Sequence, residues 1–170
     1  MTYQIQSNFD ENFKIIANTD PTALTVTTAY QEVNDSNIDY KPSPSSTYVV
    51  YQFSMYFASN QGGNTGTLEV NGFFKLQYSD DNGTTWADWG DNTIAYIGSA
   101  ASDVSQRSTV DLKWVLDASG WTSLKRLRVQ TKQDSGSNTI LHELETFFDS
   151  SGERTDTNKY NTSVSCYSVD

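Results

Sequence analysis

The sequence predicts an all-β protein: a single antiparallel β-sandwich, jelly-roll-like, with about eight strands. The chain has 170 residues, a length that suits one domain with a sizeable core. Tyr, Phe and Trp number 10, 8 and 4, an enrichment typical of strands. Apolar and polar residues alternate in several short runs, and turn-forming residues separate these runs about every 8–12 positions, as in sandwiches.

Two central runs, residues 47–57 (TYVVYQFSMYF) and 67–78 (TLEVNGFFKLQY), alternate most clearly. Period-two alternation is typical of an antiparallel strand with one buried face. We therefore expect these runs to supply much of the core, through Val49, Tyr51, Phe53, Met55, Phe57, Leu68, Val70, Phe74, Leu76 and Tyr78.

Further strands are predicted on both sides of this pair. The β-branched run 23–33 reads as the first strand, and the turn-rich segment 34–46 carries Ile38 and Tyr40 as anchors to the body. The other predicted strands are 84–89, 93–98, 109–116, 123–132, 139–148 and 162–169, the run 139–148 also fitting a helical stripe.

The chain divides into an N-terminal arm, residues 1–22, and a sandwich domain, residues 23–170. The apolar piece of the arm contains Phe13, Ile15 and Ile16, and it is too short to form a core alone. We expect the arm to lie on a neighbouring subunit, where these three side chains would be candidate partner contacts.

One motif could indicate a catalytic function. Its key residues form the pattern S-x-D-x-G-x-T-W, the "Asp box" found in sialidases: Ser79, Asp81, Gly83, Thr85 and Trp86. A sialidase propeller needs several four-stranded blades, and a single copy in this length cannot supply them. Asn82-Gly83 instead favours a type I′ hairpin, with Ser79 and Asp81 accepting N–H groups of the turn and Trp86 covering it. We interpret the motif as a structural turn.

The net charge of −10 disfavours binding to nucleic acid and to anionic membranes. The single cysteine, Cys166, excludes an internal disulfide, and it is expected to be a small buried residue. The start MTYQIQSNFD has no leader features, and no apolar run reaches 18 residues, so a soluble protein made in a cytoplasm is expected.

No catalytic centre or cofactor is predicted. Glu143 and Glu145 could form a carboxylate pair for glycoside hydrolysis, but they fall on a polar face. His142, the one histidine, has no serine or second histidine to build a triad or metal centre. Five oxygen-bearing residues could hold Ca²⁺ but are equally expected in turns: Asp80, Asp81, Asn82, Asp88 and Asp91.

Two surface features remain open to alternatives. Lys125, Arg126 and Arg128, with Lys132, form either a charge-guarded edge strand or a docking strip for an acidic neighbour. Trp86, Trp89 and Trp121 lie in or near turns, as sugar platforms do, although packing under their own loops is the commoner role. An exposed coplanar pair among them would favour sugar binding, and their burial would favour a scaffold.

Four segments, residues 38–57, 75–86, 139–143 and 147–152, together resemble β-sandwich virion structural proteins of tailed phages, especially marine and cyanobacterial ones. The resemblance implies a non-enzymatic role in the virion after assembly in the host cytoplasm. The expected role is capsid decoration, or cement, that stabilises the head as a homo-oligomer bound to the major capsid protein or other virion proteins. The alternatives are a receptor- or glycan-binding fibre or knob domain and a carbohydrate-binding module.

Overall fold

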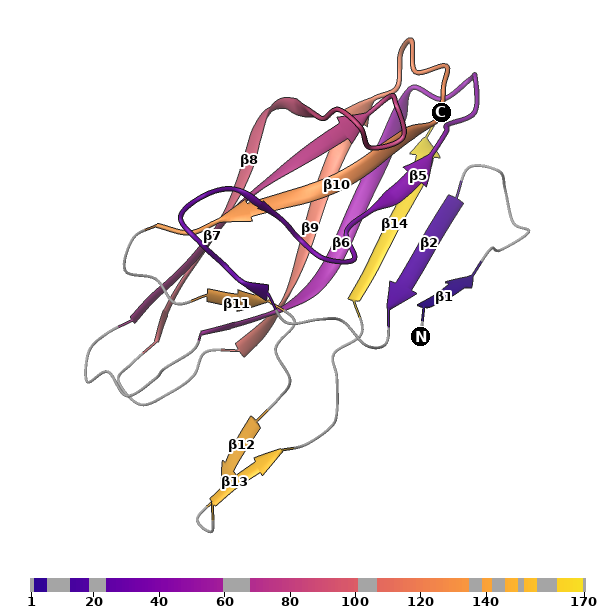
Figure 1. Ribbon diagram of the computed structural model, residues 1–170. Coiled ribbons are helices and arrows are strands. Elements are labelled where there is room, and N and C mark those ends of the chain that lie inside the picture. Colours follow the sequence, from indigo (N-terminus) through magenta and orange to yellow (C-terminus); the bar gives the residue numbers. More distant parts are fainter. Residues whose placement is uncertain are drawn as a thin grey trace.

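The computed structural model describes residues 2–5, 13–18, 24–59, 68–100, 107–134, 139–141, 146–149, 152–155 and 162–169. These residues form two antiparallel β-sheets that pack face to face (Figure 1), with no helix among them. The predicted all-β antiparallel sandwich is confirmed. The described segments accordingly include no helix that could cross a membrane.

The larger sheet, sheet A, contains β1 (Thr2–Ile5), β2 (Phe13–Asn18), β3 (Leu24–Thr25), β6 (Tyr48–Ser59), β9 (Arg107–Asp117), β11 (Thr139–Leu141) and β14 (Thr162–Val169). The smaller sheet, sheet B, contains β4 (Gln31–Glu32), β5 (Ile38–Tyr40), β7 (Leu68–Ser79), β8 (Ala87–Ala100) and β10 (Lys125–Lys132). A separate two-stranded sheet joins β12 (Thr146–Asp149) to β13 (Gly152–Thr155).

The principal strands pair in a nested order. β2 pairs with β14, β4 and β5 pair with β10, β6 pairs with β9, and β7 pairs with β8. Counted along the chain, the first of these strands therefore pairs with the last, the next with the second last, and so on towards the β7–β8 hairpin. Contacts of β14 with β6 and of β10 with β7 then complete the two sheets. This nested pairing is jelly-roll connectivity, in which a long folded-over hairpin rolls into two layers.

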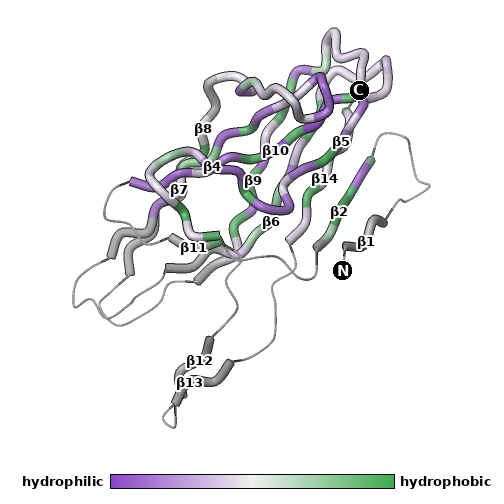
Figure 2. The backbone as a smooth tube through the Cα atoms, in the orientation of Figure 1, coloured by the Kyte–Doolittle hydropathy of each residue, from purple (hydrophilic) through white to green (hydrophobic). Residues whose placement is uncertain are grey.

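The core lies between the sheets and is built from the inward-facing apolar residues of the strands. Hydrophobic and hydrophilic residues alternate along these strands (Figure 2). Of the residues expected from the two central runs, Val49, Tyr51, Phe53, Met55, Phe74 and Leu76 are buried, which confirms the predicted register. The inward residues of β9 are also buried, together with Leu127 and Val129 of β10 and Val164 and Cys166 of β14. Phe57, Leu68 and Val70 lie where side chains are not described.

The expected number of about eight strands is too low, since the described residues place seven strands in sheet A and five in sheet B. The run 23–33 is not one strand: β3 belongs to sheet A and β4 to sheet B, with bends between them. The turn-rich segment 34–46 contains β5, whose Ile38 and Tyr40 are buried as expected. Strands of two or three residues are too short to leave a period-two signal.

Two further runs divide differently from the prediction. The predicted strands 84–89 and 93–98 belong largely to one long strand, β8, which is interrupted by a register irregularity opposite β7. The run 139–148 contributes β11 to sheet A and β12 to the separate hairpin, and residues 142–145 between them lie outside the described residues.

The expectation that the arm lies on a neighbouring subunit is wrong for residues 13–18. These residues form β2, which pairs with β14 over six residues of sheet A. Ile16 packs against the core, and Lys14 Nζ donates a hydrogen bond to the Asp39 carbonyl oxygen of β5 at 2.8 Å. The segment therefore belongs to its own sandwich, because the edge of β14 offers it both backbone partners and apolar contact.

Deleting residues 1–22 is therefore expected to destabilise the domain. The deletion removes the β14 ladder partner and uncovers core around Val164, which corresponds to about 2–4 kcal/mol of apolar contact. For a chain of this size the melting temperature should fall by about 5–15 °C. Deleting only residues 1–12, which leaves β2, is the control and should have a smaller effect; an unchanged melting temperature after the longer deletion would contradict this assignment.

Candidate functional site

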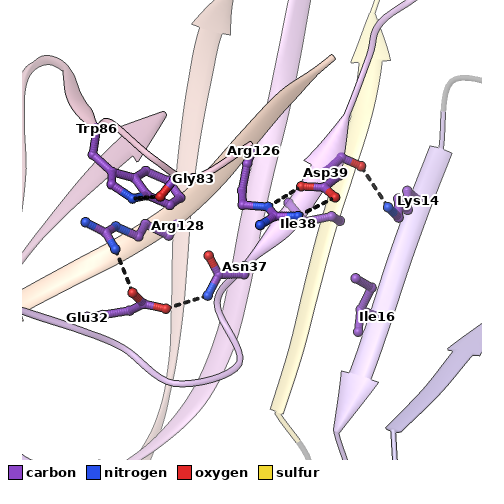
Figure 3. A pocket seen from close by; sticks show the side chains of 10 residues that line it. All are labelled: Lys14, Ile16, Glu32, Asn37, Ile38, Asp39, Gly83, Trp86, Arg126 and Arg128. Atoms are coloured by element: carbon purple, nitrogen blue, oxygen red, sulfur yellow. Dashed lines mark hydrogen bonds and ion pairs between the residues drawn. The ribbon is translucent and has the colours of Figure 1, made fainter. Parts of the chain in front are cut away.

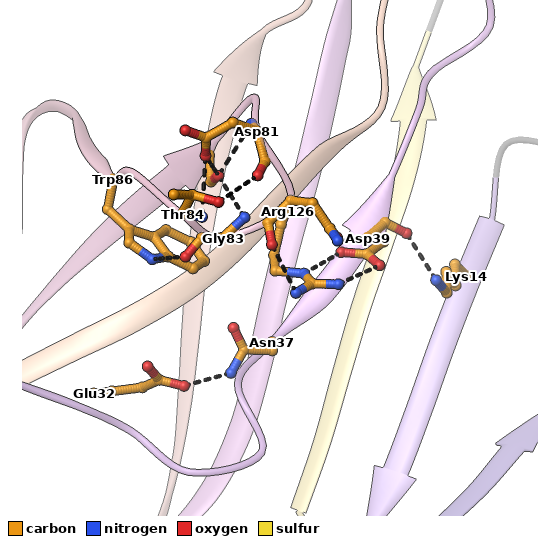
Figure 4. Close-up of polar contacts among 11 residues, drawn as sticks. Lys14, Glu32, Asn37, Asp39, Asp81, Gly83, Thr84, Trp86 and Arg126 are labelled. Carbon is orange, nitrogen blue, oxygen red and sulfur yellow. Dashed lines mark hydrogen bonds and ion pairs between the residues drawn. The ribbon is translucent and has the colours of Figure 1, made fainter.

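The Asp-box loop, residues 79–86, closes on itself through hydrogen bonds (Figure 4). The buried Ser79 hydroxyl oxygen accepts from the backbone N–H of Asp81 at 3.3 Å and of Gly83 at 2.7 Å. Asp81 Oδ1 accepts from the N–H groups of Thr84 and Thr85, and its Oδ2 accepts from the Thr85 hydroxyl at 2.7 Å. Trp86 Nε1 donates to the Gly83 carbonyl oxygen at 3.1 Å. Both Asp81 oxygens therefore serve the loop.

The connection is longer than the expected two-residue hairpin turn. β7 ends at Ser79 and β8 begins at Ala87, so the two strands are joined by residues 80–86. Asn82 and Gly83 do have positive φ, at 60° and 88°, but they lie inside this larger loop. The side-chain bonds of Ser79 and Asp81 replace strand pairing there, which the dipeptide Asn-Gly alone does not reveal.

A polar pocket of about 480 Å³ lies beside this loop (Figure 3), between β2 of sheet A and the outer side of sheet B. Its walls come from β2, the β4–β5 segment, β10 and the Asp-box loop, and the lining residues are Lys14, Ile16, Glu32, Asn37, Ile38, Asp39, Gly83, Trp86, Arg126 and Arg128. Its charged groups are largely paired with one another, so the pocket holds strands together and presents no free pair of carboxylates for acid–base chemistry.

The basic residues of β10 are engaged within the chain. Arg126 forms a two-point contact with the Asp39 carboxylate, at 2.7 and 3.0 Å, and its other nitrogen donates to the Asn82 carbonyl oxygen. The Arg126 hydrogen bond lowers the pKa of Asp39. Arg128 donates to Glu32 at 2.6 Å and stacks over the Trp86 ring at 3.8 Å from the ring centroid. Lys125 pairs with Asp80.

Neither expected role of this basic strip fits the geometry well. β10 is not an edge strand, because β4 and β5 pair with one edge and β7 with the other. The charge-guarded edge reading is therefore wrong. A docking strip for an acidic partner would have to compete with the internal acidic partners of Lys125, Arg126 and Arg128.

Of the five residues considered as Ca²⁺ ligands, three bind other groups within the described structure. Asp81 serves its own loop, Asp80 pairs with Lys125, and Asp88 contacts Gln77 at 2.7 Å and Lys75 at 3.0 Å. The bond from Gln77, followed by that from Lys75, lowers the pKa of Asp88. Among the described side chains no group of three potential ligands is assembled. The Asp91 side chain, with His142, Glu143 and Glu145, lies outside what is described.

The tryptophans expected near turns are packed against the protein. Trp121 is buried at 5% exposure, and Trp89 packs against the core with its ring tilted 38° to that of Trp121. Trp86 is half-buried under the Arg128 guanidinium. The coplanar exposed pair that would favour sugar binding is therefore absent among the three. Cys166 is fully buried, and burial raises the pKa of its thiol well above the ordinary value, which makes it unreactive.

The outer face of sheet A carries an apolar row that crosses four neighbouring strands. The ladder partners run from Phe13 through Tyr167 and Val50 to Val115. Phe13 and Val115, at the two ends, are 39% and 59% exposed. The adjacent row adds the exposed Tyr48 and Val169, which are paired with each other. We call these six residues the sheet A apolar face.

This face contains four of the six exposed large apolar side chains in the described structure, namely Phe13, Tyr48, Val115 and Val169. Exposed apolar side chains that cluster on one face indicate an interaction surface more strongly than isolated ones do. Phe13, Ile15 and Ile16 were all candidate contacts from the sequence. Phe13 is exposed on this face and Ile15 is half-buried there, whereas Ile16 packs against the core. Val115 and Val169 were not predicted as contacts, because each is the last residue on the polar-facing side of an alternating run.

No protein-family model matches this chain, and no curated protein matches it.

Replacing Gly83 by valine should lower the free energy of unfolding by about 1–3 kcal/mol, because a β-branched residue is strained at φ 88°. A Cβ there would also lie 3.3 Å from an Arg126 nitrogen and 3.4 Å from the Trp86 ring. Gly120→Val is the matched control, since Gly120 has φ 78° with no atom within 4 Å of the added Cβ. Chemical denaturation should show the larger loss for Gly83; equal losses would mean that crowding against β10 plays no part.

The Asp81 carboxylate should also give the loop a pH dependence. The Thr85 hydroxyl, the Thr85 N–H and the Ser79 hydroxyl lower its pKa from 3.8 to about 2. A lowered folded-state pKa stabilises the fold above the unfolded pKa, and this contribution is lost as the pH falls through the folded pKa. The melting-temperature difference between the wild type and Asp81→Asn should be constant above pH 3.8 and shrink towards about pH 2. A pH-independent difference would contradict the assigned hydrogen bonds.

Proposed function

We propose that the protein is a non-enzymatic structural protein of a tailed-phage virion, of the decoration or cement class, that binds a capsid protein through the sheet A apolar face. The observation that carries the proposal is the concentration of exposed apolar side chains on that face. A chain with a net charge of −10 has ample polar surface, so four exposed large apolar side chains gathered on one face are best explained by a protein partner.

Two further features support a structural role. The polar groups of the pocket and the Asp-box loop bind one another and hold β2, β5, β10 and the β7–β8 loop in place. The segments that resemble tailed-phage virion proteins include β5 and the Asp-box loop, which belong to this framework, and most of β6. Decoration would act mechanically, since an added buried interface raises the barrier to separating neighbouring capsid subunits.

The fibre or glycan-binding alternative is less well supported. Sugar sites in proteins use open aromatic faces, whereas here Trp121 is buried and Trp86 is covered by Arg128. The pocket beside Trp86 is polar, but its carboxylates are occupied by Arg126, Arg128 and Asn37.

The test begins with particles purified from cells that carry the gene. Immunogold labelling should place the protein on the head, with many copies per particle by quantitative mass spectrometry. Label confined to tail fibres would favour the receptor-binding alternative, and absence from particles would refute a virion role.

Attachment should then depend on the sheet A apolar face. Replacing Phe13 and Val115 by threonine keeps strand-forming residues but removes apolar contact, and affinity for particles lacking the protein should fall more than about tenfold. Leu124→Thr is the control, because Leu124 is 55% exposed but lies before β10 in the other sheet. Equal effects of the two changes would contradict the proposed face.

A further inference from the structure

The outer edge of β9 is a long strand edge without a partner in the described part of the chain. β9 pairs with β6 through eleven consecutive residue pairs, from Arg107 opposite Ala58 to Asp117 opposite Tyr48, with no register shift. β14 and β11 pair with β6 at the same residues, so they must occupy its opposite edge. One edge of β9 therefore presents backbone N–H and C=O groups that another strand could bind.

The corresponding edge of sheet B is built differently. β8 also pairs on one side only among the described strands, but its register with β7 shifts between Lys75 and Gln77. Gly90 adopts φ 67° within that irregular stretch. Bulges of this kind twist an edge and discourage a further strand from pairing. β9 has no such protection, which makes it the better docking edge of the two.

The exposed residues of β9 carry a charge order that is complementary to itself. Thr109, Asp111, Lys113, Val115 and Asp117 are exposed, and the alternate residues point into the core. In an antiparallel pair of β9 strands centred on Leu112, Asp111 of one copy opposes Lys113 of the other, and the reverse. Thr109 then opposes Val115, and register places Arg107 opposite Asp117.

This order distinguishes self-recognition from ordinary edge protection. Charges on edge strands usually prevent pairing because like charges meet when two copies approach. In the register centred on Leu112, every charged residue of β9 lies opposite a residue of the opposite charge. Within the described residues Asp111 and Lys113 form no ion pair. A second copy would supply a charged partner for each.

We propose that two copies of the chain associate through antiparallel pairing of their β9 edges, centred on Leu112. The contact is isologous, because a two-fold axis passes between the two facing Leu112 residues and each copy contributes the same strand. Backbone hydrogen bonds extend sheet A across the dimer, and the charge pairs select the register. This association is a property of the isolated chain and does not require the particle.

The test is a charge exchange measured by analytical ultracentrifugation at physiological ionic strength, where long-range repulsion between the acidic copies is screened. The wild type should show a concentration-dependent dimer. Asp111→Lys and Lys113→Asp should each oppose like charges twice per dimer and weaken it by at least about tenfold. The double variant Asp111→Lys/Lys113→Asp restores opposite charges and should dimerise again.

A mixing experiment separates this contact from any other. Asp111→Lys carries two positive residues at these positions and Lys113→Asp carries two negative ones, so the mixture should form a heterodimer that neither variant forms as a homodimer. Circular dichroism should show the same melting temperature for all dilute variants, because both positions are exposed. A monomeric wild type at all accessible concentrations, a dimer insensitive to the single changes, or failure of the mixture to associate would overturn the proposal.

Discussion

A hydrogen-bonded junction at Ser36, inside the core, links the two sheets. Its hydroxyl donates to the Val33 carbonyl oxygen at 2.7 Å and accepts from the Val129 N–H at 3.0 Å. Tyr51, from the opposite sheet, donates its hydroxyl to the Ser36 carbonyl oxygen at 2.5 Å. Burial raises the pKa of Tyr51 well above its usual range, so the hydroxyl stays a donor. Unpaired, such buried groups would each cost about 1–3 kcal/mol.

This junction explains why the jelly-roll strand between β2 and β6 is divided into two short strands, β4 and β5. The chain leaves β10 after Glu32, turns through Asp35 at φ 64°, and returns at Ile38. Ser36 completes the backbone bonding of β10 across the gap, and the departure of the chain opens the pocket beside Asn37. The polar outer face of sheet B follows, since Glu32 and Asp39 flank the gap and bind the arginines of β10.

The long strands were predictable because each buries one face of its pleat in a continuous core. Tyr51 and Phe53 fall on that face together, and a shift of one residue would place both in water. The short strands β3, β4 and β5 depend instead on contacts distant in sequence, such as Ser36 with Val129, which no local pattern encodes. Similarly, Phe13 and Ile16 read as an isolated arm because their partner, β14, lies at the far end of the chain.

The sheet A apolar face is harder still to read from sequence, because it is a property of four strands at once. Phe13, Tyr167, Val50 and Val115 become one row only when the registers of β2, β14, β6 and β9 are known. That row ends on β9, whose outer edge is the proposed dimer contact. Pairing two β9 strands would bring the two apolar rows onto one side of a continuous sheet. A particle offering repeated capsid sites would then be bound by both faces of one dimer, and the second attachment would be intramolecular. The two proposed contacts would therefore reinforce each other without sharing the side chains that form them, apart from Val115.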